Sequence, residues 1–504
     1  MRTETLLVAG GVATGRAVEA AVRHQASHGG SLADALESTG AASRQSIEDF
    51  IWRIPPVPAT IDESGIGSAE LLNLLLKNMY THGLETRTEI MDAIKLPQAV
   101  TTELIELAVG EKLISALGGA GANGIADMRY GLSNLGKRWA SEALERSRYV
   151  GPAPVSLASF REKAASQKLT NERLTIDRMK AAFDGLTVPQ TFYDQIGPAV
   201  NSGRAILLYG PPGNGKTSIA LRLRQAFRDV VYIPHAVSID GHIMRVFDPS
   251  LHVPIEEPTS PKPKRRSLLV DNFDARWVAC RRPFVVTGGE LTLEMLDLRY
   301  DEKSQQYEAP LHIKATGGCL LIDDFGRQLV SPKALLNRWI IPLENRVDYL
   351  KLHTGMSFGL PFETLVIFST NFEPASLMDP AFLRRIPYKI PVRGPTVDDY
   401  RCIFEKEARE HGIELGPDVV DHVVTELTGT HRLKLAAFQP RFIIQQIVAA
   451  CAFRQEPPHF EPALIEHALA NLTVEQADVQ SDAAPEMSVA GDEPRRPLRL
   501  ATGP

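Results

Sequence analysis

The chain has 504 residues, of which 44% are hydrophobic and 23% are charged, and its formal net charge is −6. A single hydrophobic core stops growing at about 250 to 300 residues, so this length predicts several domains. The ordinary composition excludes a wholly disordered chain and an integral membrane protein, and the weak negative charge gives no overall attraction to nucleic acid or anionic lipid.

The cysteines and the apolar runs indicate the compartment. Four cysteines lie far apart in the sequence, at Cys280, Cys319, Cys402 and Cys451. This spacing matches neither a zinc-binding pair nor a disulfide framework, which favours free thiols in a reducing cytosol. The apolar run at residues 6–12 is too short to favour a signal peptide, and no run reaches the roughly 18 residues of a transmembrane helix. We therefore expect a cytoplasmic protein with no membrane insertion.

Residues 1–60 predict a small helical N-terminal domain. Apolar side chains including Leu32 and Leu36 lie on one helical face, and Gly40 is a typical helix stop before the apolar stripe resumes. The stretch 29–51 resembles part of the N-terminal helical domain of type II secretion and type IV pilus ATPases.

Residues 66–150 predict three helices, a Gly-rich turn, a short extended segment and a closing helix, an order that resembles a winged-helix domain. Such domains bind DNA or proteins. Phosphate contact would need basic residues on the third helix, yet residues 98–112 contain Glu103, Glu106 and Glu111 against a single lysine. We therefore favour contact with a protein client, and nucleic-acid contact stays an alternative.

Residues 169–392 predict an α/β core, which follows a Pro-containing, polar linker at 151–168. The apolar strand at 205–209 runs directly into the loop GPPGNGKTS and then into a helix. This loop consists of Gly210, Pro211, Pro212, Gly213, Asn214, Gly215, Lys216, Thr217 and Ser218. Glycines allow successive backbone N–H groups to point at phosphate oxygens, while Lys216 adds a cation. Because the Thr217 hydroxyl suits Mg²⁺, the loop predicts a site for ATP and Mg²⁺.

A second element follows at the apolar run 318–322, which ends in Asp323 and Asp324. Such a run is typical of a central parallel strand, and α/β sheets place ligands at the carboxyl ends of their strands. Carboxylates at this place can bind Mg²⁺ or accept a proton, although aspartates at strand ends are also common turn formers.

Two more candidate elements come next in the sequence. The strand at 364–369 is followed by Asn371, although a lone asparagine at a strand end is usually a turn residue. Residues 379–390 then predict a short helix that ends in Arg384 and Arg385, followed by a strand. Guanidinium groups suit the charge that develops on a transferred phosphate, although cations at a helix C-terminus also complement the helix dipole.

Residues 393–475 predict four helical segments. Arg441 lies in the first turn of the third segment, where a cation is disfavoured by the helix dipole and must find an anion elsewhere. The sequence of 476–504 is rich in Ala, Pro, Glu and Arg without apolar periodicity, which predicts a disordered tail.

Over roughly residues 169–472, the order of these motifs resembles that of AAA+ ATPases. The resemblance implies a P-loop core with a five-stranded parallel sheet and a helical lid. It makes the glycine loop the Walker A motif and the acidic pair Walker B, in which Asp323 would hold Mg²⁺ through water and Asp324 would be the general base that polarises the attacking water. It makes Asn371 sensor 1, whose side chain would orient that water. Either Arg384 or Arg385 would be the arginine finger, and Arg441 would be sensor 2. A hairpin is expected within 344–368, just before the sensor 1 strand, and its presence there resembles the layout of MoxR-type and other AAA+ proteins with a hairpin before sensor 1. The segment 313–327 resembles the approach to Walker B in MoxR-type ATPases and in enhancer-binding activators.

The same resemblance implies a function. A homo-oligomeric ring, with hexamers expected, would hydrolyse Mg-ATP and remodel or assemble a protein client through its N-terminal domains. One alternative is an ATP-dependent transcription or DNA-remodelling factor that uses the winged helix. The other is a nucleotide-gated scaffold with little hydrolysis, since most AAA+ proteins have glutamate where this chain has the shorter Asp324.

Three remaining features have weaker interpretations. His235, His242 and His252 lie close in sequence without a metal-binding spacing, which favours surface or hydrogen-bonded histidines. The basic loop 258–267 is interpreted as a solvated loop. Residues 284–312 are expected as an insertion between the second and third core strands.

Overall fold

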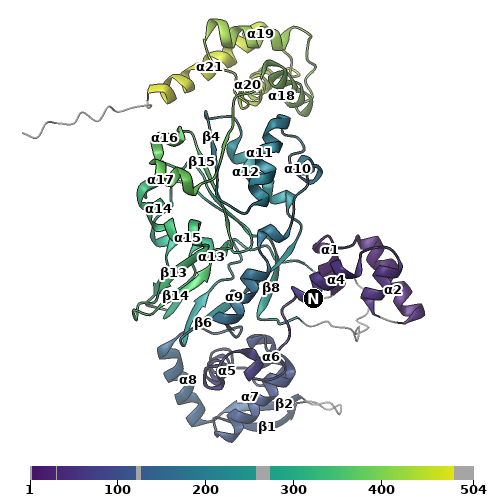
Figure 1. Ribbon diagram of the computed structural model, residues 1–504, viewed down its shortest axis with the longest axis vertical. Coiled ribbons are helices and arrows are strands. Elements are labelled where there is room, and N and C mark those ends of the chain that lie inside the picture. The colour runs from purple at the N-terminus through teal and green to yellow at the C-terminus, as the bar shows by residue number, and fades with distance from the viewer. Residues whose placement is uncertain (1–2, 30, 121–126, 257–272, 482–504) are drawn as a thin grey trace, which may run out of the picture. The chain divides into compact units, whose positions relative to one another are not determined.

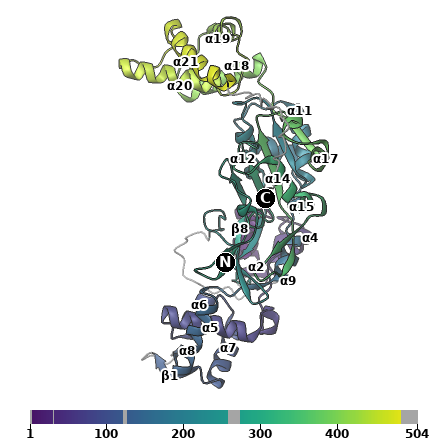
Figure 2. The same cartoon turned by 90° about the vertical axis from the view of Figure 1, so that its left-hand side faces the viewer.

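The computed structural model describes residues 3–29, 31–120, 127–256 and 273–481, and Figures 1 and 2 show them in two perpendicular views. They belong to two compact units. The first comprises Met1–Pro211 and Gly215–Val392, and the second comprises Pro212–Asn214 and Arg393–Pro504. Within the described ranges, no helix has the length and apolar character needed to cross a membrane.

Short helices open the first unit, where the sequence predicts a helical region. They are α1 (Thr3–Ala9), α2 (Gly15–His28), α3 (Leu32–Ser38) and α4 (Arg44–Trp52). Each of the last three begins after a serine or threonine whose hydroxyl accepts a hydrogen bond from a backbone N–H in the first turn. Leu36 and Phe50 are buried in one apolar cluster with Trp277, so these helices pack on the β-structure of the first unit.

The next region follows the element order that resembles a winged helix. Its elements are α5 (Ser68–His82), α6 (Arg87–Ile94), α7 (Gln98–Gly110), β1 (Ile114–Ala120), β2 (Asp127–Leu132) and α8 (Asn134–Arg146). The strands β1 and β2 pair antiparallel. Leu75, Ile90 and Leu104 are fully buried in a core shared by the helices. The winged-helix assignment itself stays a prediction.

Residues 151–168 differ from the linker that the sequence predicts. They contain β3 (Val155–Ser156) and α9 (Leu157–Ser166). Val155 and Phe160 are buried in the same cluster as the N-terminal helices, so the segment is part of the folded unit. The helix escaped prediction because only two of its positions, Phe160 and Ala164, are buried and apolar.

Smaller β-structures complete this part of the first unit. A second sheet has the order β10-β11-β7-β6-β3. Its further strands are β6 (Ala236–Ile239), β7 (His242–Arg245), β10 (Arg299–Asp301) and β11 (Gln306–Glu308). An antiparallel pair consists of β5 (Val230–Pro234) and β8 (Trp277–Arg281). The hairpin that the sequence predicts is formed by β13 (Val347–Lys351) and β14 (Ser357–Pro361), and Gly355 at its turn has φ +97°.

The central sheet has five parallel strands, as the predicted fold class requires. They are β4 (Ile206–Tyr209), β9 (Phe284–Thr287), β12 (Cys319–Ile322), β15 (Leu365–Thr370) and β16 (Tyr388–Pro391). Their order is β16-β4-β15-β12-β9. The expected insertion at 284–312 is therefore wrong for its first residues, which form the edge strand β9. A four-residue strand, with three apolar residues and a threonine, is too short for its periodicity to reveal that role.

Helices cover both faces of the central sheet (Figure 1). One face packs against α10 (Ile176–Ala182), α11 (Gln190–Asn201) and α12 (Lys216–Ala226). The other packs against α13 (Leu311–Lys314), α14 (Pro332–Arg338), α15 (Ile340–Asn345) and α17 (Pro380–Arg385), with α16 (Pro374–Leu377) before α17. Strand side chains alternate between the faces, so Leu208 joins the first core and Leu207 the second. Single-turn helices lie at Asp62–Ser64, Leu169–Asn171 and Glu294–Leu296.

The second unit is helical, as predicted for 393–475. Its helices are α18 (Val397–Glu410), α19 (Val419–Thr425), α20 (Gln439–Arg454) and α21 (Pro462–Ser481), and α19 continues into a π-helical turn at Glu426–Thr430. Tyr400, Ile444 and Leu469 are buried in its core. The predicted disordered tail, 476–504, is corrected at its start because α21 runs through Ser481. The rest of the tail and the basic loop 258–267 lie outside the described residues.

A buried network of charges fixes the chain just after β8. Arg282 is 6% exposed, and its guanidinium lies 2.9 Å from a carboxylate oxygen of Glu172 and 2.9 Å from one of Asp229. It also donates to the carbonyl oxygens of Gln167 (3.0 Å) and Gly317 (2.5 Å). Since removing one partner leaves buried charge uncompensated, Arg282→Ala should lower the free energy of unfolding by about 3–5 kcal/mol in urea denaturation.

The neighbouring Arg281 provides the matched control for that prediction. Its side chain is exposed and donates to the backbone oxygen of Ala9 at 2.9 Å. We expect Arg281→Ala to change the free energy of unfolding by less than about 1.5 kcal/mol. Equal losses in the two variants would show that the carboxylate network does not stabilise the fold.

Candidate functional site

The glycine loop joins β4 to α12 and uses glycine where other residues would not fit. Gly210 has φ +142°, and a Cβ atom there would lie 2.3 Å from the carbonyl oxygen of Val392. Gly215 has φ +81° and forms the N-terminal cap of α12. These positions require glycine, because a side chain would clash at Gly210 and strain the backbone at Gly215.

Lys216 is the first residue of α12 and is 7% exposed. Its Nζ donates to the carbonyl oxygens of Gly210 at 2.8 Å and Pro211 at 2.9 Å. Burial lowers the pKa of Lys216, and the charges of Asp324 and Asp323 act in the opposite direction. Within the described part of the chain, no carboxylate forms an ion pair with this ammonium group. A phosphate could therefore take the place of its two neutral acceptors.

Thr217 and Asp323 meet although they lie 106 positions apart in the sequence. The Thr217 hydroxyl donates to Asp323 Oδ2 at 2.7 Å. The two residues meet because α12 begins, and β12 ends, at the carboxyl ends of the parallel strands. A hydroxyl and a carboxylate are hard oxygen ligands of the kind that Mg²⁺ binds together with water and phosphate oxygens. These two side chains therefore fit a Mg²⁺ site.

Asp324 and Asn371 come from strands that are neighbours in the sheet. The strand β15, which precedes Asn371, lies between β4 and β12, as the sensor interpretation requires. Asn371 Nδ2 lies 3.4 Å from Asp324 Oδ1, a long hydrogen bond. Asp324 itself is exposed and has φ +48°, a left-handed conformation that aspartate and asparagine adopt more readily than most residues. The acidic pair and the amide thus share one edge of the sheet with the glycine loop.

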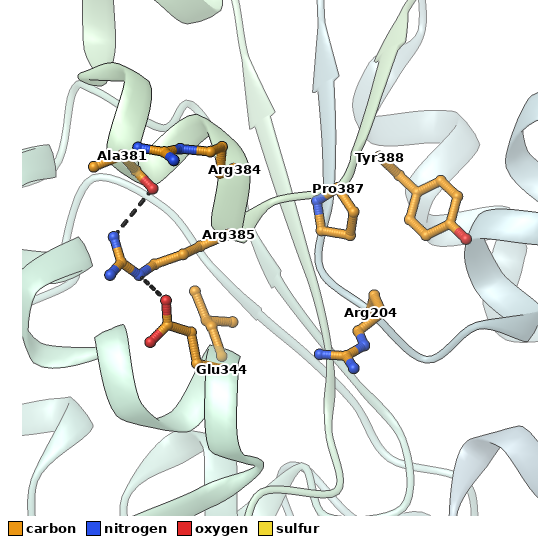
Figure 3. Close-up of a pocket in the computed structure, with 8 residues that line it drawn as sticks. Arg204, Glu344, Ala381, Arg384, Arg385, Pro387 and Tyr388 are labelled. Atoms are coloured by element: carbon orange, nitrogen blue, oxygen red, sulfur yellow. Dashed lines mark hydrogen bonds and ion pairs between the residues drawn. The ribbon is translucent and has the colours of Figure 1, made fainter.

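The two arginines at the end of α17 line a cavity of about 560 Å³, shown in Figure 3. Arg204, Glu344 and Tyr388 also line this cavity. It lies at the amino ends of β4 and β16, whereas the glycine loop follows the carboxyl end of β4. With three arginines against one glutamate, its lining favours an anionic occupant.

The two arginines differ in their partners. Arg385 Nε lies 2.6 Å from Glu344 Oε1, and its Nη1 donates to the carbonyl oxygen of Ala381 at 3.0 Å. Arg384 is exposed and makes a long 3.4 Å contact to the carbonyl oxygen of Pro380. Among the described residues, no carboxylate lies within ion-pair distance of Arg384, and Figure 3 shows it directed away from Glu344.

The middle of the glycine loop, Pro212–Asn214, belongs to the second unit. The backbone N–H of Phe438 donates to the carbonyl oxygen of Gly213 at 3.0 Å, and that of Ala437 donates to Asn214 Oδ1 at 3.2 Å. A Cβ atom on Gly213, which has φ +76°, would lie 2.3 Å from the Phe438 ring. Phe438 precedes α20 and was missed by the sequence reasoning, because an apolar residue at a helix start carries no functional signal.

Arg441 has an acidic partner inside the second unit. Its Nη2 lies 3.0 Å from Glu407 Oε1 on α18. A cation in the first turn of α20 needs an anionic partner, and for Arg441 that partner is Glu407. The Arg441 side chain is 61% exposed, and its contact with a phosphate stays a prediction.

The buried His252 has a hydrogen-bond partner at each of its ring nitrogens. His252 is buried, its Nδ1 accepts the backbone N–H of Asp248 at 2.8 Å, and its Nε2 lies 2.8 Å from the carbonyl oxygen of Lys314. Burial lowers the pKa of His235 to about 4. In the ranges that the structure describes, no three His, Cys, Asp or Glu side chains are grouped as metal ligands.

Comparisons with known proteins give a family match for the second unit alone. A domain of unknown function, DUF8689, matches residues 396–471. No curated protein matches the chain. Similar solved structures include NtrX from Brucella abortus, which is 15% identical with a TM-score of 0.34 over 64% of this chain and 63% of that chain. A point mutant of RuvB from Thermotoga maritima is 12% identical with a TM-score of 0.32 over 61% and 73%. The chain thus spans less than two thirds of the NtrX chain.

The structure is that of an α/β protein in which a glycine loop joins a strand of the parallel sheet to a helix. Its glycine loop, acidic pair and strand-end asparagine come from β4, β12 and β15, neighbouring strands of one parallel sheet. Sequence reasoning named these residues, but it missed Glu344 and Glu407, whose partners lie far away in sequence. It also missed Gln328, which donates to the carbonyl oxygens of Asp323 and Asp324 in the irregular loop after β12.

Proposed function

We propose that the protein is an AAA+ ATPase that hydrolyses Mg-ATP. The observation that carries this proposal is the 2.7 Å hydrogen bond from Thr217 to Asp323, next to a buried Lys216 that has no acidic partner among the described residues. A hydroxyl, a carboxylate and a cation at the start of one helix suit the Mg²⁺ and the phosphates of a nucleoside triphosphate.

Each side chain has a role in this proposal. Thr217 and Asp323 would hold Mg²⁺, which would neutralise charge on the phosphate oxygens when bound. Lys216 exchanges its carbonyl acceptors for phosphate oxygens. Asp324 accepts a proton from the attacking water, and Asn371 orients that water from the adjacent strand.

The proposal includes a homo-oligomeric ring, with six subunits expected. The arginine-rich cavity lies at the amino ends of the strands and the glycine loop at their carboxyl ends. The arginines of the cavity would therefore act on the nucleotide of a neighbouring subunit. Arg384 is the better finger of the two, because Glu344 neutralises Arg385. The closer likeness to MoxR-type ATPases rests on the hairpin of β13 and β14 that precedes β15. Arg441 would contribute from the lid.

The ring would remodel or assemble a protein client that binds its N-terminal regions. On α7, the exposed side chains include the carboxylates Glu103 and Glu106 beside the apolar Leu107 and Val109. Carboxylates repel a phosphate backbone, whereas exposed apolar side chains suit a protein surface. This surface therefore supports a protein client over DNA.

A second candidate function is a nucleotide-gated scaffold with little hydrolysis. The observation in its favour is the long 3.4 Å contact of Asn371 with the short Asp324 side chain, which holds the base loosely. Both candidates bind ATP and differ in turnover.

The test is steady-state phosphate release by the full chain, with Lys216→Ala as the comparison. We expect wild type to release phosphate at least about 100-fold faster than Lys216→Ala, since the variant loses the charge that faces the phosphates. Equal rates in the two proteins, with ATP bound by wild type, would replace the ATPase proposal with the scaffold.

A further inference from the structure

The loop that follows β12 is held by one side chain that acts on three backbone groups. Gln328 Nε2 donates to the carbonyl oxygen of Asp323 at 2.7 Å and to that of Asp324 at 3.0 Å. Its Oε1 accepts the backbone N–H of Gly326 at 2.8 Å. The amide of Gln328 therefore uses both of its ends on the residues of the acidic pair and the turn beyond them.

This bonding coincides with an unusual backbone. Asp324 has φ +48° and Gly326 has φ +108°, so the chain turns through two left-handed conformations within three residues. Such conformations persist when surrounding contacts over-determine them. On the buried side, the Phe325 N–H donates to the carbonyl oxygen of Ser369 at 2.7 Å, and the Thr370 hydroxyl donates to the Phe325 carbonyl oxygen at 2.6 Å. On the other side of the loop, the side chain of Gln328 holds the backbone through its three hydrogen bonds, and we call this arrangement the clamp.

We propose that Gln328 is a positioning residue that sets the direction of the Asp323 and Asp324 carboxylates. The inference rests on the proposed ATPase function, and it concerns a residue that does not touch the substrate. The Asp324 carbonyl oxygen also accepts the backbone N–H of Arg327 at 2.9 Å, so the Asp323 carbonyl depends more on the clamp. Without the clamp, the Asp323 carbonyl group would turn toward solvent and the peptide between the two aspartates would rotate. The Asp323 carboxylate would then leave the Thr217 hydroxyl, and Asp324 would leave the reach of Asn371.

Three variants separate the two ends of the Gln328 amide. Gln328→Ala removes all three hydrogen bonds. Gln328→Glu keeps an acceptor for the Gly326 N–H but sets a carboxylate against two carbonyl oxygens. Gln328→Asn keeps the amide on a shorter chain and should restore part of the loss. Gln190→Ala is the matched control, because Gln190 bonds at 3.2 Å to Asp194 within the exposed face of α11.

We expect Gln328→Ala and Gln328→Glu to lower kcat for ATP hydrolysis about 10- to 100-fold, as the loss of an outer-shell partner does at metal sites. KM and the thermal midpoint should stay close to those of wild type, and Gln190→Ala should keep wild-type kcat. Mn²⁺ binding to the full chain with a non-hydrolysable ATP analogue, followed by electron paramagnetic resonance, should weaken about 10-fold in the same variants.

The outcomes distinguish this inference from the ATPase proposal. If wild type hydrolyses ATP and Gln328→Ala keeps its kcat and its Mn²⁺ affinity, the positioning role is wrong while the ATPase stands. A loss of kcat that only follows a fall in thermal midpoint would also overturn it, because it would mark a general loss of fold. If wild type itself releases no phosphate, the ATPase proposal fails, and the Mn²⁺ affinity alone decides for or against the role of Gln328.

Discussion

Replacing Asp324 by asparagine should lower steady-state phosphate release about 100- to 10,000-fold, the contribution of a positioned general base. The substitution removes the proton acceptor and keeps the size of the side chain. ATP binding should persist, because Lys216 and the glycine loop are unchanged. The measurements are phosphate release under saturating Mg-ATP and equilibrium binding of a fluorescent ATP analogue.

Asparagine can adopt the backbone conformation of residue 324, so the substitution changes the charge of the side chain without straining the backbone. With φ +48°, residue 324 lies in the left-handed region, where asparagine and aspartate are both enriched over other non-glycine residues. The variant should therefore fold like wild type, and a fall in rate will report the lost carboxylate. Unchanged turnover in Asp324→Asn would exclude Asp324 as the base.

The same conformation offers a physical reason for the shorter acid. Under the proposed AAA+ function, Asp324 stands where most members of that family have glutamate, and this difference favours the alternative of a slow or inactive enzyme. A left-handed residue favours aspartate over glutamate, so the choice is consistent with the local backbone. In the Asp324→Asn background, adding Gln328→Ala should cost less than it costs in wild type, because only the part of the Gln328 effect that acts through Asp323 remains.

The parts of the site that sequence predicts are those encoded in consecutive residues. The glycine loop requires glycine for local reasons, at Gly210 and Gly215, and an apolar strand that ends in two aspartates is local as well. The placement of Asn371 beside Asp324 followed from the order of the motifs, and the order of β4, β15 and β12 agrees with it.

The parts that sequence did not predict depend on partners that are distant or irregular. Glu344 pairs with Arg385 across two helices, and Glu407 pairs with Arg441 across 34 positions. A surface glutamate has no pattern that names its partner. The strand β9 was mistaken for part of an insertion because its four residues fit several structures equally well, and only its pairing with β12 makes it a core strand.

Arg384→Ala should lower the rate of ATP hydrolysis by about 1,000-fold or more, while leaving ATP binding unchanged. The guanidinium of Arg384 has no acidic partner among the described residues, so it is free to approach a phosphate of the adjacent subunit. Arg385→Ala should have a smaller effect on rate and should lower thermal stability, because it breaks the 2.6 Å ion pair with Glu344. Glu344→Gln is the control that releases Arg385 without removing it.

Mixing subunits tests whether Arg384 acts across a subunit interface. A Lys216→Ala subunit keeps Arg384 but has lost its phosphate-binding cation, and an Arg384→Ala subunit has the reverse defect. When the two inactive proteins are combined, interfaces that join an intact glycine loop to an intact Arg384 should recover a measurable fraction of wild-type phosphate release. Absence of recovery in mixtures shown to co-assemble, or loss of ATP binding by folded Arg384→Ala, would contradict the role in trans. Recovery would place the arginine-rich cavity at the interface between subunits, because neither variant holds both groups within one chain.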